Sequence, residues 1–382
     1  MEDKENVLLI IFLLYIENMK PQIIALYLPQ FHPVKENDEW YGAGFTEWTN
    51  VAKAKPLFKG HQQPKIPKDL GFYDLRVPEI RKRQAEMAID AGISAFCYYH
   101  YWFGNGKVLL EKPLMEMVNT DEPDFPFCIC WANVSWQNKL WNPTTKKIGS
   151  KLLIEQQYPG IEDIKAHFNF LLPAFKDERY YKIDGRLLFV KYEMKDMPNF
   201  EQYKSIWNEL AKENGLPEFY FLAFANNMDE LAKSQKFSAD GIVLSLLHSV
   251  EHLNWPRYKR GIRKIWFKLR HLPRFRYSYK KAMKSFVCSE CKDDNVIPVI
   301  IPNWDNTPRR AWDALILTNS NPSLFKQHVR EVLDCVKDKP ENKQIIFLKS
   351  WNEWGEGNYM EPDLQYGHGY INALKEALEE YK

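Results

Sequence analysis

Short apolar runs alternate with amphipathic stretches along almost the whole sequence, and this alternation is the feature that most limits the possible folds. Most runs are continuously apolar, which is typical of strands buried on both faces in a parallel sheet. Eight strands are predicted, over residues 23–28, 94–101, 125–131, 186–192, 218–224, 241–247, 296–302 and 345–350. Helices are predicted over 78–91, 110–119, 161–176, 200–214, 322–337 and 369–381. This α/β order predicts a single (β/α)8 TIM barrel with loop insertions.

Chain length and charge agree with this prediction. A barrel of about 250 residues with insertions accounts for the 382 residues, and two smaller domains would also do so. A doubly wound sheet is the weaker alternative, because no G-x-G-x-x-G follows the first strand and no Walker loop occurs. The net charge of +2 gives no reason to expect nucleic acid as a partner.

The cysteine and aromatic contents set further limits. Six cysteines in a chain this long do not indicate a disulfide framework, and Cys97, Cys128 and Cys130 lie in apolar runs typical of buried thiols. Cys288 and Cys291 have metal-ligand spacing but no second pair, so we expect no metal, no cofactor and a reducing, cytoplasmic compartment. The 13 Trp, 20 Tyr and 23 Phe fit either a large core or surfaces that stack on sugar rings.

Two segments fall outside the barrel pattern. Residues 1–18 contain ten consecutive apolar residues, too few to span a bilayer, and Met19-Lys20 directly precedes the first strand. We expect 1–18 to be an extension outside the fold, with a weak membrane-surface anchor as the alternative, and 19–382 to form one domain. The second segment is a basic insert at about 255–290, with twelve Lys/Arg and no Asp/Glu from Arg257 to Lys284.

The basic insert has two interpretations. It forms a solvated helix or loop before the seventh strand, or it contacts an anionic membrane, a phosphate-bearing lipid-linked glycan or an acidic polysaccharide. The second interpretation would hold a cytoplasmic protein at the inner face of the membrane. Aromatic residues interleave the basic ones at Trp266, Phe267, Phe275, Tyr277 and Tyr279.

Polar and aromatic side chains recur where the predicted strands end. In a (β/α)8 barrel the carboxyl ends of the strands meet at one face, where reactive groups collect. The residues at these ends are Gln30, His32, Tyr99, His100, Trp102, Trp131, Asn133, Tyr192, Glu193, Asn226, His248, Trp304, Asp305, Trp351, Asn352 and Glu353. We therefore expect a binding pocket at this face.

The strongest motif is SWNEWGEGNYMEPD, residues 350–363, directly after the eighth strand. Glu353, Glu356 and Glu361 fall within nine residues and are flanked by Trp351 and Trp354. Glycosidic chemistry needs two carboxyl groups in different protonation states, and two neighbouring glutamates can drive their pKa values apart. The alternatives are ordinary hydrogen bonds in a tight turn, or a divalent-metal site without a nearby histidine.

Seven segments carry a family resemblance. They are IIALYLPQFHPVKENDEWYGAGFTEWTNV (23–51), GFYDLR (71–76), AGISAFCYYHYWFGNGK (91–107), FCICWAN (127–133), IDGRLLFVKY (183–192), NWDNTPRR (303–310) and WNEWGEGNYMEPD (351–363). On these segments the chain resembles the WbsX family, described as glycosyltransferases of polysaccharide and O-antigen loci. That family is similar to glycoside hydrolase family 99, the endo-α-mannosidase-type barrels, so the resemblance implies a glycosidase-like catalytic domain over 19–382.

The resemblance also implies roles for individual residues. Glu353 and Glu356 match the two catalytic carboxylates of family 99, of which the first assists attack by the sugar 2-hydroxyl and the second is acid and then base at the glycosidic oxygen. Substrate contacts are expected from Glu47, Trp48, Tyr99, His100, Trp102, Trp131, Asn133, Trp304, Asp305, Arg309, Trp351, Asn352, Trp354 and Glu361. For some of these a structural role is the alternative, since Asp305 and Arg309 would fix a loop by pairing, and His100 would be a core histidine.

One segment departs from the family pattern. After the third strand the WbsX pattern is W-A-N-E-N-W-T-R-R-W-D-G, whereas this chain has WANVSWQNKLWNP at 131–143. Val134 replaces a glutamate, an arginine is absent and Asn142 replaces an aspartate, which makes the specificity of the substrate site different from the family's.

Three functions remain open on the sequence alone. The first is a WbsX-type glycosyltransferase of bacterial cell-surface polysaccharide, either lipopolysaccharide O-antigen or capsule, although no Asp-x-Asp motif occurs. The second is an endo-acting retaining glycoside hydrolase or transglycosylase. The third is a non-catalytic glycan-binding protein. The expected partner in every case is a glycan or a sugar donor.

Overall fold

The computed structural model describes residues 21–138, 141, 142, 144, 147–194, 197–250, 273 and 275–381. The predictions for 1–18 and for most of the basic insert, residues 257–272 and 274, lie outside the described residues.

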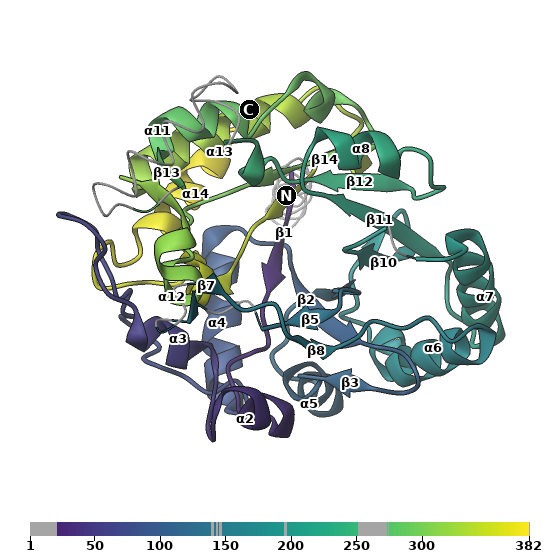
Figure 1. Cartoon of the computed structure of the whole chain (residues 1–382). Coiled ribbons are helices and arrows are strands. Elements are labelled where there is room, and N and C mark those ends of the chain that lie inside the picture. Colours follow the sequence, from purple (N-terminus) through teal and green to yellow (C-terminus); the bar gives the residue numbers. More distant parts are fainter. Residues whose placement is uncertain are drawn as a thin grey trace, which may run out of the picture.

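Eight parallel strands close into a barrel (Figure 1). They are β1 (Gln22–Tyr27), β2 (Ala95–Trp102), β4 (Phe127–Trp131), β10 (Arg186–Lys191), β11 (Phe219–Ala225), β12 (Gly241–Leu244), β14 (Val296–Ile300) and β16 (Ile345–Leu348). β1 closes the ring, with Ile24 in register with Ala95 of β2 and Ala25 in register with Leu348 of β16. Each predicted strand overlaps one barrel strand, so the predicted (β/α)8 fold is confirmed.

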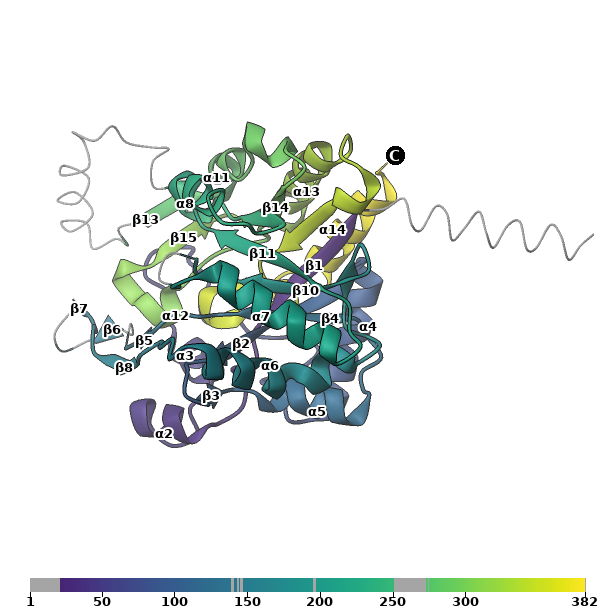
Figure 2. The same ribbon diagram turned by 90° about the vertical axis from the view of Figure 1, so that its right-hand side faces the viewer.

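Amphipathic helices surround the barrel (Figure 2). The six predicted ones are α4 (Pro78–Ala91), α5 (Lys112–Thr120), α6 (Ile161–Lys176), α7 (Phe200–Glu213), α13 (Pro322–Val336) and α14 (Gly369–Glu379). α4 begins with a proline, which needs no helical N–H partner there, and ends at Gly92 with a left-handed φ of 83°. α13 buries Phe325, Val329 and Val332 along one face.

Several short elements at the carboxyl ends of the strands were not predicted. These helices are α2 (Lys35–Tyr41), α3 (Glu47–Lys53), α8 (Met228–Ser234), α11 (Tyr279–Ala282) and α12 (Thr307–Arg310). The short strands β5 (Trp136–Gln137) and β8 (Leu152–Ile154) pair with each other, as do β13 (Phe275–Ser278) and β15 (Leu315–Thr318). Elements this short contain too few residues to show a periodic pattern in the sequence. They are stabilised by tertiary contacts and not by intrinsic propensity.

The core is rich in aromatic residues and continuous through the barrel. Trp207, Trp351 and Trp354 are among the largest fully buried side chains. Cys97 and Cys128 are buried and in register on β2 and β4, and Cys130 is buried on β4, which confirms the predicted buried thiols. In the part of the chain that the structure describes, no helix is both long enough and apolar enough to cross a membrane.

Candidate active site

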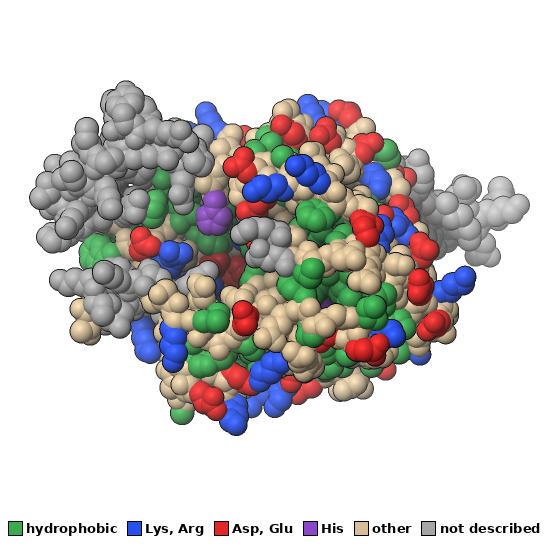
Figure 3. All heavy atoms as spheres, turned by 45° about the vertical axis from the view of Figure 1, so that its right-hand side comes forward, with side chains coloured by type: hydrophobic (Ala, Val, Ile, Leu, Met, Phe, Trp, Pro, Cys, Tyr) green, Lys and Arg blue, Asp and Glu red, His purple; other side chains and the backbone are tan. Residues whose placement is uncertain are grey.

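A pocket of about 390 Å³ lies at the carboxyl ends of the barrel strands. Its wall includes Gln30, Tyr41, Glu47, Tyr99, Tyr101, Val134, Trp136, Tyr192, Arg309, Lys349, Glu353 and Glu356. The face of the molecule in Figure 3 has a hollow with acidic side chains at its bottom. The residues that line the pocket come from the ends of β1, β2, β4, β10, β14 and β16, so six of the eight barrel strands contribute to it.

A tight hairpin after β16 presents the two predicted catalytic glutamates. β17 (Asn352–Glu353) pairs antiparallel with β18 (Asn358–Tyr359), and a 3-10 turn, Trp354–Glu356, connects them. The side chain of Asn352 accepts a hydrogen bond from Leu28 N at 2.7 Å and donates one to Leu28 O at 3.0 Å. Asn352 therefore fastens the hairpin to the end of β1 and is itself fully buried.

Gly355 allows close packing between this turn and two charged side chains. A Cβ at residue 355 would lie 1.8 Å from Oε2 of Glu47 and 3.1 Å from Nε of Arg309. Any side chain at position 355 would displace Glu47 and Arg309, which is why glycine is required at this position of the motif. Gly357 ends the turn with a φ of 54°, in the left-handed region.

Arg309 links two of the three carboxylates of the pocket. Its Nη1 donates to Oε1 of Glu356 at 2.7 Å, and its Nη2 lies 3.0 Å from Oε2 of Glu47. Glu47 is buried, and Glu356 is partly exposed to the pocket. A charge-assisted pair of this kind orients the side chain of Glu356.

Glu353 is the carboxyl of the pocket with the most perturbed proton affinity. Its side chain is 6% exposed, and its Oε2 has no hydrogen-bond partner in the structure. Burial, followed by the neighbouring charge of Glu356, raises the pKa of Glu353 to about 7 although Lys349 and Arg309 oppose the shift. The raised pKa means that Glu353 is partly protonated near neutral pH.

Lys349 places a buried positive charge beside this pair. Burial alone lowers the pKa of Lys349, but the charges of Tyr192, Glu353 and Glu356 outweigh burial and leave the pKa above its ordinary value. Its Nζ lies 5.9 Å from the ring centroid of Tyr192 and 5.5 Å from that of Trp304. Lys349 is thus charged and held between aromatic rings.

Tyrosines form much of the remaining wall. Burial raises the pKa of Tyr99, Tyr101 and Tyr192, with a further contribution from the charge of Glu353. These phenols stay neutral and can donate hydrogen bonds to hydroxyl-rich ligands. Trp136 extends the aromatic surface and packs edge-on against Tyr101 at 5.0 Å between ring centroids. Flat rings beside hydroxyl donors are suited to a sugar.

Five of the predicted site residues line the pocket: Glu47, Tyr99, Arg309, Glu353 and Glu356. Four others support the hairpin from behind without lining the pocket. Trp354 stacks on Tyr359 at 3.8 Å and donates to Glu361, while Trp48 packs on Trp354 at 5.4 Å. Burial raises the pKa of Glu361 to about 7. Trp351 is fully buried against Phe96.

Four predicted residues on β2 and β4 face other surroundings. Side chains of a strand alternate between its two faces, so Tyr99 and Tyr101 line the pocket while His100 and Trp102 do not. His100 Nε2 lies 2.9 Å from His167 Nε2, as expected of the core-histidine alternative, and Trp102 stacks on His167. The two further residues are Trp131, which stacks on Tyr203 of α7, and Asn133, which donates to Glu193 O at 2.7 Å.

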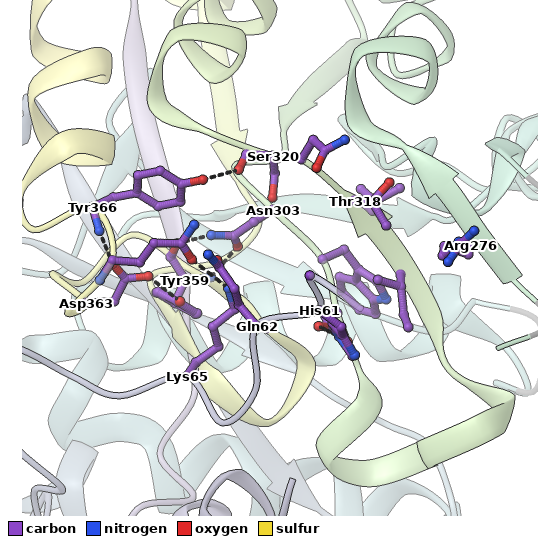
Figure 4. Close-up of a pocket in the computed structure, with 18 of the residues that line it drawn as sticks. His61, Gln62, Lys65, Arg276, Asn303, Thr318, Ser320, Tyr359, Asp363 and Tyr366 are labelled. Atoms are coloured by element: carbon purple, nitrogen blue, oxygen red, sulfur yellow. Dashed lines mark hydrogen bonds and ion pairs between the residues drawn. The ribbon is translucent and has the colours of Figure 1, made fainter. Parts of the chain in front are cut away.

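Trp304 and Asp305 line a neighbouring cavity of about 450 Å³ instead (Figure 4). The predicted alternative that Asp305 pairs with Arg309 is wrong. Asp305 accepts from His61, Gln63 and Thr307, while Arg309 pairs with two glutamates from distant segments. Sequence proximity did not reveal these partners.

Lys349, Trp136, Tyr41 and Tyr101 line the pocket but were not predicted as site residues. Lys349 directly precedes the motif, and the side chain of Tyr101 lies on the same face of its strand as that of Tyr99. The sequence therefore indicates the positions of both residues.

Among the described residues, no group of three or more His, Cys, Asp or Glu is placed to hold a metal ion. Cys288 and Cys291 lie with their sulfur atoms 3.7 Å apart.

A (β/α)8 barrel with two neighbouring carboxyls at the end of its eighth strand is an arrangement that carbohydrate-active enzymes use. The sequence profile of Glycosyltransferase WbsX matches residues 23–374, so the chain belongs to the WbsX glycosyltransferase family. The predicted resemblance is thereby confirmed.

Relatives and solved structures agree with this assignment. WxcX of Xanthomonas campestris pv. campestris (strain B100) is 32% identical over 371 residues, which cover 95% of this chain and 50% of that protein. The chain thus spans about half the length of the curated relatives that it matches. The GH99 endo-alpha-mannosidase from Bacteroides thetaiotaomicron has a TM-score of 0.57 at 14% identity and covers 94% of this chain and 97% of its own. A glycoside hydrolase-like protein has a TM-score of 0.56 at 14% identity, with 94% of both chains covered. These two structures share the fold.

Proposed function

We propose that the chain is a glycosyltransferase that builds bacterial cell-surface polysaccharide, lipopolysaccharide O-antigen or capsule, with Glu353 and Glu356 as its catalytic carboxyls. The observation that carries the proposal is the pair itself. Both carboxyls line one pocket, and burial with mutual repulsion raises the pKa of Glu353 to about 7. Glycosyl transfer needs one group that donates a proton and one that accepts a proton, and two neighbouring carboxyls in one pocket can provide both.

The roles follow the family pattern. In the first step Glu353 takes the proton of the sugar 2-hydroxyl, whose oxygen attacks the anomeric carbon, while Glu356 protonates the leaving oxygen. In the second step Glu356 takes the proton of the acceptor hydroxyl, and Glu353 returns its proton to the 2-oxygen. Burial favours the protonated form of Glu353, so in this proposal Glu353 passes its proton to Glu356 before the first step, which makes Glu353 the base and Glu356 the acid.

Other residues of the pocket would bind and orient the sugar. Arg309 holds Glu356 and Glu47 in place, and Tyr99 and Tyr192 donate hydrogen bonds. Val134 lines the same pocket where the family pattern has a glutamate. We propose that this apolar wall selects a different sugar from that bound by relatives that keep the glutamate.

The test compares turnover with and without an acceptor. A panel of nucleotide-linked and lipid-linked sugars is offered with acceptor oligosaccharides, and products are identified by mass spectrometry. A transferase forms a longer glycan only when the acceptor is present, whereas a hydrolase releases reducing sugar in water alone. A non-catalytic binding protein would keep its glycan affinity in Glu356→Gln and show no turnover beforehand.

Variants assign the chemistry to the carboxyl pair. Glu353→Gln and Glu356→Gln should each lower turnover at least ~100-fold, as loss of a general acid or base does. Glu213→Gln, at the exposed end of α7, is the matched control and should leave turnover unchanged. Full turnover in both pocket variants would overturn the proposal.

We also propose that the basic insert holds this cytoplasmic enzyme at an anionic membrane or a lipid-linked glycan. The support is the run of twelve Lys/Arg without an acidic residue from Arg257 to Lys284. Pelleting with vesicles of anionic and of neutral lipid tests it. Equal pelleting with both kinds of vesicle would refute it.

A further inference from the structure

A second cavity directly adjoins the candidate active site. Neighbouring residues in the sequence line the two cavities. Asp305 and Gly357 line the second cavity, whereas the adjacent residues Asn306 and Glu356 line the catalytic pocket. The backbone N–H of Asp305 donates to Glu356 O at 2.8 Å. The backbone of residues 305–306 and 356–357 therefore forms the wall between this cavity and the catalytic pocket.

Three basic side chains line this cavity: Lys59, Lys65 and Arg276. Figure 4 shows Lys65 to one side of His61 and Arg276 to the other. Lys65 Nζ donates to the neutral amide of Gln365 at 3.1 Å, and the guanidinium of Arg276 lies 4.6 Å from the ring centroid of Phe58. Among the described residues, none of the three forms an ion pair, although the charges of Asp305 and Asp363 act on Lys65.

The acidic residues of the cavity are already fully engaged. Oδ2 of Asp305 accepts from His61 and Gln63 at 2.7 Å each, and Oδ1 accepts from the hydroxyl of Thr307 at 2.5 Å. Asp363 accepts from the hydroxyl of Tyr359 at 2.7 Å and from two backbone N–H groups. Neither carboxylate has an oxygen that lacks a partner, and the lining therefore holds three cations against two carboxylates that are already hydrogen-bonded.

His61 adds a neutral surface rather than a charge. Its Nδ1 accepts from Leu57 N at 3.1 Å, so its Nε2 carries the proton that is donated to Asp305. The indole N–H of Trp304, another lining residue, is buried and lacks an acceptor among the described residues. Three cations against two carboxylates leave a net positive charge beside the catalytic pocket, which favours an anion rich in acceptor oxygens.

We propose that this cavity binds the phosphate or diphosphate of an activated sugar donor while the sugar occupies the catalytic pocket. The inference rests on the proposed transferase function and names its donor class. In the first step the 2-oxygen bonds to the anomeric carbon and the bond from that carbon to the phosphate oxygen breaks, with its electron pair on the oxygen, which Glu356 protonates. In the second step the acceptor oxygen bonds to the anomeric carbon as the bond to the 2-oxygen breaks, Glu356 takes the acceptor's proton and Glu353 returns its proton to the 2-oxygen.

Calorimetric titration with inorganic pyrophosphate tests the site without turnover. We expect saturable binding to the full chain, weakened at least ~10-fold in Lys65→Met and in Arg276→Gln, because each change removes a charge-assisted contact. Lys82→Met, an exposed lysine of α4, is the matched control and should bind as the parent chain does. Urea unfolding of each variant verifies that the fold is intact.

The outcomes separate this inference from the proposed function. No pyrophosphate binding, or equal binding by the parent chain and both cavity variants, would overturn it, even if Glu353→Gln and Glu356→Gln abolish transfer. Retained pyrophosphate binding in Glu353→Gln would support it independently of catalysis. Uridine diphosphate and farnesyl diphosphate then distinguish the source, because a nucleotide-linked donor predicts tighter binding of the first and a lipid-linked donor tighter binding of the second.

Discussion

Replacing Glu353 by glutamine should stabilise the fold at alkaline pH while it abolishes function. The side chain is 6% exposed, and burial raises its pKa to about 7 from an ordinary value of 4.5. At 1.36 kcal/mol for each pKa unit, ionising Glu353 in the folded protein costs about 3 kcal/mol more than in the unfolded chain. Glutamine has the same shape and carries no charge, so the variant avoids this cost.

The sign of the pH dependence follows from the same shift. Below pH 4.5 the carboxyl is protonated in both the folded and the unfolded chain, so the parent protein and the variant have similar stability. Between about 4.5 and 7 the unfolded chain loses the proton first, and the stability of the parent protein falls relative to the variant. Above pH 7 the full difference of about 3 kcal/mol is reached.

Urea unfolding of the parent protein and of Glu353→Gln at pH 5 and pH 8 measures this difference. The variant should unfold at a higher urea concentration at pH 8, with a much smaller gain at pH 5. Glu213→Gln should show no pH-dependent gain, because that carboxyl is exposed. A variant no more stable than the parent at pH 8, or equally stabilised at both pH values, would refute the raised pKa of the buried Glu353.

Further consequences concern catalysis and the turn. The parent turnover should fall as pH rises above about 7, because Glu353 loses the proton that it passes to Glu356, and a flat kcat/KM profile between about pH 6 and 9 would contradict this. With a glycosyl fluoride donor and azide, which need neither acid nor base, Glu356→Gln should form glycosyl azide while Glu353→Gln stays inactive; rescue of Glu353→Gln alone would reverse the two roles. Gly355→Ala should lose ~1–3 kcal/mol in urea unfolding and much of its turnover, because a Cβ there would come within 1.8 Å of Glu47; parent-like values would show that the ion pair is dispensable.

The sequence predicted the architecture because its signal is local and repeated. Continuous apolar runs such as 186–192 became barrel strands, and periodic stretches such as 161–176 became the outer helices. The alternation of side chains along β2 separates Tyr99, which lines the pocket, from His100, which packs on His167. This alternation is a local signal that can be read from the sequence.

Long-range partners could not be predicted in the same way. Arg309 pairs with Glu47 and Glu356 across 262 and 47 residues of sequence, and no spacing rule indicates such a contact. The roles of Glu361 and Trp354 behind the hairpin likewise depend on three-dimensional packing. The short helices and strand pairs around the pocket have no periodic signal, so the sequence placed the carboxyls without showing what surrounds them.

The most direct test of the account is a crystal structure of Glu356→Gln with a bound donor oligosaccharide. We predict that one anomeric carbon lies between the side chains of residues 353 and 356, with its 2-hydroxyl within hydrogen-bonding distance of Glu353. A sugar ring bound elsewhere on the barrel, with both of these side chains turned away from it, would contradict the assignment of this pair to glycosyl transfer.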